Sequence, residues 1–144
     1  MATTNLKAYD QTVATLLSTE LNSLANGSLS SVSSAVDNST NLSIWMDVEL
    51  VLAAQGSARS AGATCTLFIS PSLDGTNYTD NTVEQEIAFV FPLDAATTAR
   101  RHVRRGFELP PLSTIKFSLL NSTGQALAAS GNTVKYRTRN LTTA

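Results

Sequence analysis

Residues 41–53 alternate apolar and polar side chains in a strict period of two. The apolar positions run from Leu42 to Leu52 at every second residue, and the positions between them include Trp45, Asp47 and Glu49. A period of two means that one face of a strand is buried and the other meets water or a partner. The segment therefore predicts a long β-strand with one buried face.

Shorter segments with the same alternation follow, and turn residues such as Gly, Pro and Asn separate them. Between Thr12 and Leu24, helical spacing competes with β-preferring residues, and we favour a strand followed by a turn over a helix. About eight short strands with regularly spaced turns predict an all-β fold, an antiparallel β-sandwich or jelly roll. The further strands are expected near residues 63–70, 87–93, 100–109, 115–119 and 134–138.

The 144 residues fit a single domain with a sizeable core. We expect one β-sandwich domain over residues 11–139, a flexible N-terminal arm at 1–10 and a flexible C-terminal tail at 140–144. Both ends are polar and lack periodicity. Simple fraying and arms that order on a partner are alternative interpretations of these ends.

The surface is expected to be polar but weakly charged. Only 15% of the residues are charged, while Ser, Thr and Asn together supply about a third of the chain. Such a surface suits close packing of many copies in fibres, shells or lattices, although secreted binding modules share it. The net charge of −1 provides no general attraction to nucleic acid or to anionic lipid. We therefore expect neither as a partner.

Cys65 is the only cysteine and lies within an apolar run. A single cysteine excludes an intrachain disulfide, and its position predicts a buried, inert thiol. This is consistent with synthesis in a reducing cytoplasm. No stretch has the pattern of a signal peptide or of a membrane span, and we expect neither.

No residue pattern typical of catalysis or of cofactor binding occurs. The only histidine, His102, lies among arginines, which repel a metal cation. Glu84 and Glu86 share a strand face as a paired acid and base would, but a solvated face explains them better. Asp74-Gly75 indicates a tight turn rather than a calcium loop. We expect a protein that is not an enzyme and that binds no cofactor or metal.

The basic run at residues 100–105 is the main candidate interface, and it holds four of the ten Lys and Arg residues. By parity, Arg101 and Arg105 fall on the same strand face as Val103, and Phe107 shares that parity. Guanidinium groups on an apolar face are costly unless they pair with carboxylates or lie at a subunit boundary. We favour a contact with another subunit or partner over ordinary solvated arginines on an edge strand. The candidates are Arg100, Arg101, Arg104 and Arg105.

Trp45 and Phe68 complete the candidate protein interface, because both fall on the polar parity of their expected strands. Exposed aromatic side chains on one sheet face mark a protein interface or a sugar platform. The alternative is that the N-terminal segment or a second sheet covers this face.

The C-terminal third of the chain resembles small virion proteins of tailed bacteriophages. Residues 107–124 and 127–136 carry the likeness, with the sequences FELPPLSTIKFSLLNSTG and LAASGNTVKY, and residues 70–78, SPSLDGTNY, resemble the same group. From its first to its last segment, residues 70–136, the likeness spans about half of the chain. It rests on structural residues, so no functional site transfers with it.

This resemblance implies a β-sandwich that is made in the host bacterial cytoplasm and built into the virion. The implied role is a capsid decoration or cement protein on the capsid surface, bound to the major capsid protein and assembled as a homotrimer or other homo-oligomer. Each copy would bridge neighbouring capsomers, and many equivalent sites make modest single contacts sufficient.

Two other classes of function remain open. The first is a tail or fibre component that binds host-surface carbohydrate through Trp45, Phe68 and Tyr78. The second is an enzyme such as a cell-wall hydrolase, which would use Glu84 or Glu86 and has no other support in the sequence.

Overall fold

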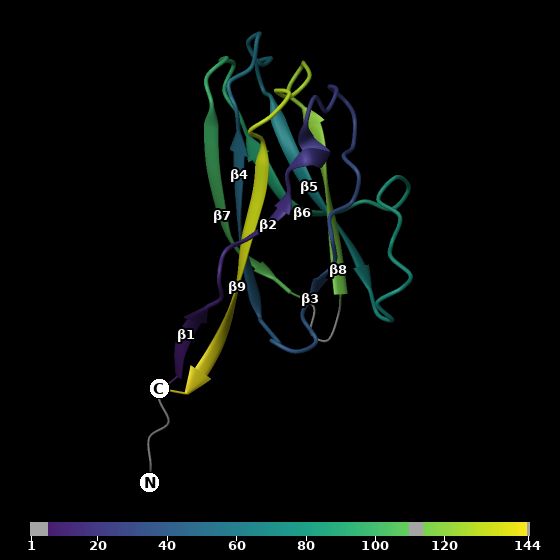
Figure 1. Ribbon diagram of the computed structural model, residues 1–144, viewed down its shortest axis with the longest axis vertical. Coiled ribbons are helices and arrows are strands. Elements are labelled where there is room, and N and C mark those ends of the chain that lie inside the picture. The colour runs from purple at the N-terminus through teal and green to yellow at the C-terminus, as the bar shows by residue number, and fades with distance from the viewer. Residues whose placement is uncertain (1–5, 110–113, 144) are drawn as a thin grey trace.

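Two antiparallel sheets pack face to face in the computed structural model, which describes residues 6–109 and 114–143 (Figure 1). The predicted all-β sandwich is confirmed, with nine strands in the described residues. Sheet A has the order β1-β9-β4-β7, with β2 also paired to β9, and sheet B has the order β3-β8-β5-β6. Sheet A contains β1 (Leu6–Asp10), β2 (Ala14–Leu17), β4 (Trp45–Leu52), β7 (Arg100–Glu108) and β9 (Thr133–Thr143). Sheet B contains β3 (Val36–Asp37), β5 (Thr64–Ser72), β6 (Glu86–Pro92) and β8 (Thr114–Ser122).

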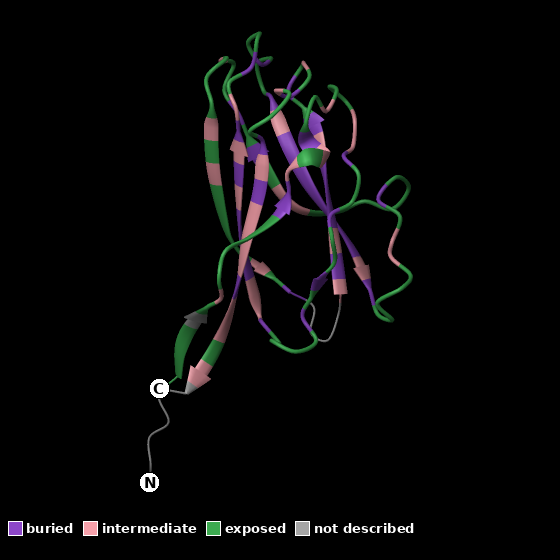
Figure 2. Cartoon of the chain, in the orientation of Figure 1, coloured by how far each residue is buried: buried purple, intermediate pink, exposed green. Residues whose placement is uncertain are grey.

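The core lies between the two sheets, where inward-facing residues of the central strands are buried (Figure 2). The alternation that predicted the long strand has this cause: Met46, Leu50 and Leu52 of β4 face inward and are buried. Strands β5 and β8 supply the opposing side chains, which include Leu67 and Phe117. Burying each of these apolar side chains stabilises the fold by about 1.5–3 kcal/mol. Packing of β4 of sheet A against β5 and β8 of sheet B therefore supplies much of the core.

The segment between Thr12 and Leu24 forms a strand and a turn, as predicted. It contains β2, followed by one turn of 3-10 helix, η1 (Thr19–Leu21). Leu17 and Leu21 are buried at this end of the core. The β-preferring residues belong to the strand and the helical spacing to the 3-10 turn, which explains why both patterns occur between Thr12 and Leu24.

The described parts of the two chain ends pair with each other. β1 runs antiparallel to the end of β9, with Leu6 opposite Thr143 and Asp10 opposite Arg139. This two-stranded ribbon extends beyond the sandwich (Figure 1). Flexibility of the ends in solution stays a prediction. Residues 1–5 of the expected arm, residue 144 of the expected tail and residues 110–113 lie outside the described residues.

The outer face of sheet B, which points away from sheet A, is covered by the connection between β5 and β6. Phe68 lies on this face and is only 3% exposed. Its cross-strand neighbour Ser118 accepts a hydrogen bond from Asn81 Nδ2 at 2.9 Å, and Asn81 belongs to the covering loop. Phe68 is therefore not an exposed aromatic, and its cover is a loop rather than the N-terminal segment or a second sheet.

Candidate protein interface on sheet A

Strand β7 is an edge of sheet A, and a bulge decides which way its side chains face. Arg101 and Val103 lie opposite Val51 and Glu49 on the outer face, away from sheet B. The register shifts beside Asp47, where β7 inserts an extra residue. Gly106 has a φ of +80° there, a conformation that favours glycine.

The bulge corrects the expectation from parity for this strand. Before it, Arg101 and Arg105 share the solvent-facing side with Val103, which is 53% exposed. After it, Phe107 turns inward, opposite Met46, and packs against the core. The arginines therefore do not point toward an apolar side. The argument from parity for a subunit boundary does not hold, although a role of these arginines in an interface stays a prediction.

Arg104 ties the two sheets together at their open edge. It lies opposite the inward-facing Val48, and its Nη2 donates to the carbonyl oxygen of Val90 in β6 at 3.1 Å. Beside it, the rings of Phe89 and Phe107 meet edge to face, with centroids 5.7 Å apart. This candidate residue therefore has a structural partner within the chain.

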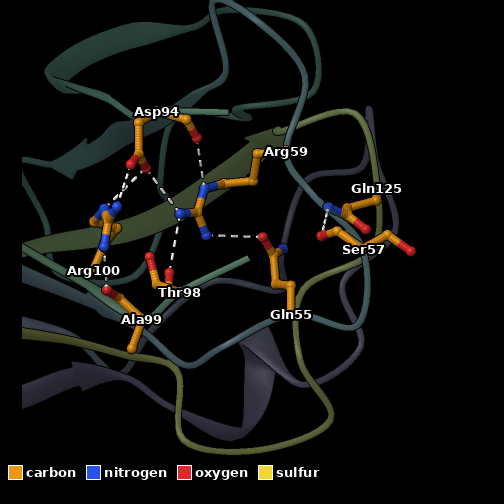
Figure 3. Close-up of polar contacts among 8 residues, drawn as sticks. All are labelled: Gln55, Ser57, Arg59, Asp94, Thr98, Ala99, Arg100 and Gln125. Carbon is orange, nitrogen blue, oxygen red and sulfur yellow. Dashed lines mark hydrogen bonds and ion pairs between the residues drawn. The ribbon is translucent and has the colours of Figure 1, made fainter. Parts of the chain in front are cut away.

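Arg100 joins a second polar cluster, which is built around the buried Arg59 (Figure 3). Arg59 Nη2 donates to Asp94 Oδ1 at 2.9 Å and to the carbonyl oxygen of Thr98 at 3.0 Å, and its Nη1 donates to Gln55 Oε1 at 3.0 Å. Arg59 Nε donates to the carbonyl oxygen of Asp94 at 3.0 Å. The Arg59 side chain is completely buried. The cluster fastens the β4–β5 loop to the β6–β7 loop.

Both arginines in this cluster act on Asp94. Arg100 Nε donates to Asp94 Oδ1 at 2.9 Å, and Arg100 Nη2 donates to Oδ2. Hydrogen bonds from Arg100 and then from Arg59 hold the pKa of Asp94 well below its usual range. A third loop is fastened to the same end of the sandwich, because Gln55 Nε2 donates to the carbonyl oxygen of Ala126 at 3.2 Å. Arg100 is thus committed to the fold at the start of β7.

Arg101 and Arg105 remain available on the outer face of sheet A. The Arg101 side chain is 68% exposed, and its Nε lies 3.6 Å from Glu49 Oε2, which makes a weak surface ion pair. Arg105 has no ion pair or hydrogen bond with the described part of the chain. Both side chains are exposed, and neither guanidinium group makes a hydrogen bond within the described part of the chain.

A surface cavity of about 280 Å³ opens on this face, between β7 and Val13, the residue before β2, and we call it the basic groove. Strands β4 and β9 form its floor, with Glu49 and Lys135 directly opposite each other. The exposed Val13 and Val103 line it together with Arg105. Lys135, like Arg105, has no ion pair within the described residues. The groove therefore combines two unpaired cations with exposed aliphatic side chains.

The floor of the groove is held by the buried carboxylate of Asp47. Arg139 Nη2 lies 2.5 Å from Asp47 Oδ1, Arg137 Nε lies 3.2 Å from Oδ2, and the Gly106 amide donates to Oδ1 at 3.1 Å. Burial alone would raise the pKa of Asp47, but these hydrogen bonds outweigh it and lower the pKa. Asp10 also pairs with both arginines, which links the N-terminal ribbon to the groove.

The remaining candidate aromatic residues do not share one surface. Trp45 lies on the outer face of sheet A, opposite Arg139, and is half-buried. Phe68 is buried under sheet B's covering loop. Tyr78 has Lys116 Nζ 4.1 Å from its ring centroid, so a cation already occupies that ring face. The platform of Trp45, Phe68 and Tyr78 expected for sugar binding is therefore not assembled.

Reasoning from the sequence missed Arg59, Asp47 and Lys135. The sequence held one usable signal for Asp47 and Lys135. Both lie at the polar positions of an alternating strand, so the two side chains would point to the same sheet face if their strands were paired. Arg59 lies in a loop without periodicity, and its burial depends on three loops that meet only in the folded chain.

No group of three or more His, Cys, Asp or Glu side chains is placed to hold a metal ion in residues 6–109 and 114–143. Burial raises the pKa of the Cys65 thiol to about 12, so the thiol is not a nucleophile at neutral pH. Within the same residues, no helix is long and apolar enough to cross a membrane.

No protein-family model matches the chain, and no curated protein is significantly similar to it. Among solved structures, the chain is similar to part of dimeric latent PorU from Porphyromonas gingivalis, with a TM-score of 0.47 and 16% identity over 95% of this chain and 13% of that chain. It is also similar to a chain in the structure of infectious bursal disease virus Gx strain, with a TM-score of 0.34 and 14% identity over 95% of this chain and 32% of that chain. A CBM4 structure gives a TM-score of 0.28 and 10% identity over 76% of this chain and 72% of that chain. At this level of likeness none of these proteins informs on function.

Proposed function

We propose that the chain is a non-enzymatic structural protein of a bacteriophage virion, a capsid decoration or cement protein bound to the major capsid protein on the outer shell. The resemblance of residues 70–78, 107–124 and 127–136 to small phage virion proteins supports this role. The weakly charged, polar composition is also suited to a lattice of many copies.

The observation that carries the proposal is the outer face of sheet A. Arg101, Arg105 and Lys135 lie there beside the exposed Val103. Arg101 makes a weak ion pair with Glu49, and the other two have no ion pair within the described residues. Arginine beside exposed aliphatic groups is common in protein contact surfaces, whose rims are polar and solvated. Arg100 and Arg104 play a different part, because each is bound within the chain.

The proposed mechanism is mechanical. Each copy would bridge neighbouring capsomers and bury surface that the bare shell leaves exposed. Pressure from packaged DNA would then have to break these contacts before the shell opens. Many equivalent sites on a symmetric shell let contacts of modest strength suffice.

Cryo-electron microscopy of purified virus particles tests the location. Density for this chain at regular positions on the shell, around threefold or quasi-threefold contacts, is the expected result. Density confined to the tail or its fibres would overturn the decoration role and favour a tail or fibre component. In that case Trp45, the half-buried aromatic of sheet A, becomes the first residue to replace in a carbohydrate-binding measurement.

Incorporation of variants into particles tests the contact face. We expect Arg101→Glu/Arg105→Glu to fold normally and to be depleted from particles. The matched control, Arg101→Lys/Arg105→Lys, keeps both charges and is expected to be incorporated. Normal incorporation of the charge-reversed variant would exclude this face as the contact.

A further inference from the structure

We propose that copies of this chain associate head to tail, with an acidic edge of sheet B in one copy seated in the basic groove of the next copy. The inference names the partner of the contact face in the proposed function, and it rests on that function only in using the same face.

The acidic edge lies at the start of β6 and in the loop before it. It consists of Val83, Glu84, Glu86, Ile87 and Val90, all of which are exposed. The aliphatic members are unusually open to solvent for their type, with Val83 80% and Ile87 56% exposed. Neither glutamate has an ion pair within the described part of the chain. This edge thus carries free negative charge beside exposed aliphatic groups.

Two aliphatic residues of the acidic edge, Ile87 and Val90, face away from the sandwich core. Ile87 lies opposite Phe68, and Val90 lies opposite Thr66. Directly opposed residues of an antiparallel pair point to the same side of the sheet, which here is the outer face of sheet B. From sheet A, Arg104 reaches the backbone of this strand at Val90, and the Ile87 and Val90 side chains stay 56% and 41% exposed. Glu86 lies opposite the core residue Ile69, so it projects from the other side of the strand, where it is exposed at the edge of the sheet.

The basic groove has the complementary composition. Its carboxylates, Asp47 and Glu49, already lie against arginines. Arg105 and Lys135 form no ion pair among the residues described, although Glu49 lies directly opposite Lys135 in the strand pair. β7 and β9 flank β4, so these two cations project from strands about 10 Å apart. One segment with two nearby carboxylates and flanking aliphatic side chains would satisfy both cations.

The two surfaces belong to different sheets and are not equivalent, which determines the type of assembly; they approach each other where Arg104 of β7 donates to the carbonyl oxygen of Val90 in β6. In Figure 1, β7 and β9 of sheet A lie to the left, and the connection that leads into β6 lies to the right, beyond sheet B. Contacts between two different surfaces are heterologous, and they generate a closed ring or an open filament. A net charge of −1 adds little repulsion between copies.

Pairing of two β7 edges is the obvious competing contact, and the arginines of β7 oppose it. Antiparallel pairing of β7 with itself would bring Arg101, Arg104 and Arg105 of both copies together, and like charges across a strand pair are destabilising. Charged side chains on an edge strand commonly prevent such pairing. The remaining way to use the outer face of sheet A is to dock a surface of opposite charge.

Sedimentation velocity of the purified full chain tests the proposal. We expect the sedimentation coefficient to rise with protein concentration and to fall again as sodium chloride is raised toward about 1 M, where charges are screened within about 3 Å. A wild-type chain that stays monomeric over the whole concentration range at low salt would overturn the proposal.

Charge-swapped variants identify the surfaces. Arg105→Glu/Lys135→Glu and Glu84→Lys/Glu86→Lys should each weaken association by about tenfold or more, because attraction becomes repulsion. The combined fourfold variant should associate again, since its groove is acidic and its edge is basic. Arg105→Lys/Lys135→Arg keeps the charges and should assemble like the wild type. Circular dichroism and melting temperature verify that each variant folds.

Loss of association in both double variants with recovery in the fourfold variant would support the contact, because a merely misfolded double variant has no reason to be rescued by two more substitutions. Unchanged association of both double variants, or no recovery in a folded fourfold variant, would overturn it. A monomer that is nevertheless found on the shell would reject the head-to-tail contact and leave the virion role standing. A self-associating chain that is absent from the shell would do the reverse.

Discussion

The Arg59 cluster and the basic groove use arginine in opposite ways. Arg59 is completely buried and donates hydrogen bonds to Asp94, Thr98 and Gln55, and these bonds join two loops. Arg105 is exposed and has no such partner among the described residues. Removing a buried cation leaves acceptors without donors in a low-dielectric site, whereas an exposed one is replaced by water. The first arginine serves stability, and the second is free to serve a partner.

The largest effect is expected for Arg59→Ala. The substitution leaves the carbonyl groups of Asp94 and Thr98 without their donor and opens a cavity, and we expect it to lower the free energy of unfolding by about 3–5 kcal/mol. Urea denaturation measures this change. Arg59→Lys keeps the charge but lacks the planar fork, and it should recover less than half of the loss. A loss below about 1 kcal/mol for Arg59→Ala would contradict the structural role.

The second largest effect on stability is expected at Asp47, the buried carboxylate in the floor of the groove. Asp47→Asn removes the buried charge that Arg137 and Arg139 share, and we expect the free energy of unfolding to fall by about 2 kcal/mol. Asp10→Asn is the matched control, because Asp10 pairs with the same arginines but is much more exposed. It should cost less than about 1 kcal/mol. Equal effects of the two substitutions would show that burial does not set the strength of these pairs.

Acid should weaken the Arg59 cluster. The pKa of Asp94 is lowered in the folded protein from its usual value of 3.8, so below that pH the unfolded chain binds a proton that the folded chain does not. Stability is therefore fully present above about pH 4 and is lost as the pH falls toward the lower pKa of the folded state. Asp94→Asn should flatten this part of the curve in denaturation experiments between pH 2 and 5. An unchanged dependence of the free energy of unfolding on pH would show that protonation of Asp94 does not destabilise the folded protein.

The smallest effect on folding is expected for the groove cations. Arg105→Ala/Lys135→Ala should change the free energy of unfolding by no more than about 0.5 kcal/mol, because neither side chain has an ion pair in the described residues. The same denaturation assay as for Arg59→Ala gives a direct comparison of the two regions. A loss as large as that of Arg59→Ala would mean that the groove cations stabilise the fold, and the contrast between the regions would fail.

Periodicity predicted the strands well because alternation is a local consequence of backbone geometry. The expected strands near residues 63–70, 87–93, 100–109 and 115–119 correspond to β5, β6, β7 and β8. The two-residue strand β3 was missed because two residues carry no period. The strand expected at 134–138 is longer as β9, since β1 pairs with its polar end. That end has no hydrophobic alternation to reveal it.

The candidate interface was only partly predictable. The run at 100–105 was noticed because its charge is concentrated, but parity assigned its faces incorrectly beyond the bulge at Gly106. A bulge leaves one weak signal, a glycine in a strand. Phe68 was expected on an open face because nothing in its own strand indicates the loop that covers it.

The sequence by itself determined that this chain is an all-β sandwich with a thiol in its core and a concentrated basic strand, because these properties follow from neighbours along the chain. Only the tertiary structure decided which arginines are hydrogen-bonded within the fold and which face solvent. It also decided that Lys135 joins Arg105 beside the buried Asp47, because strand register and loop packing bring together residues that are far apart in the sequence.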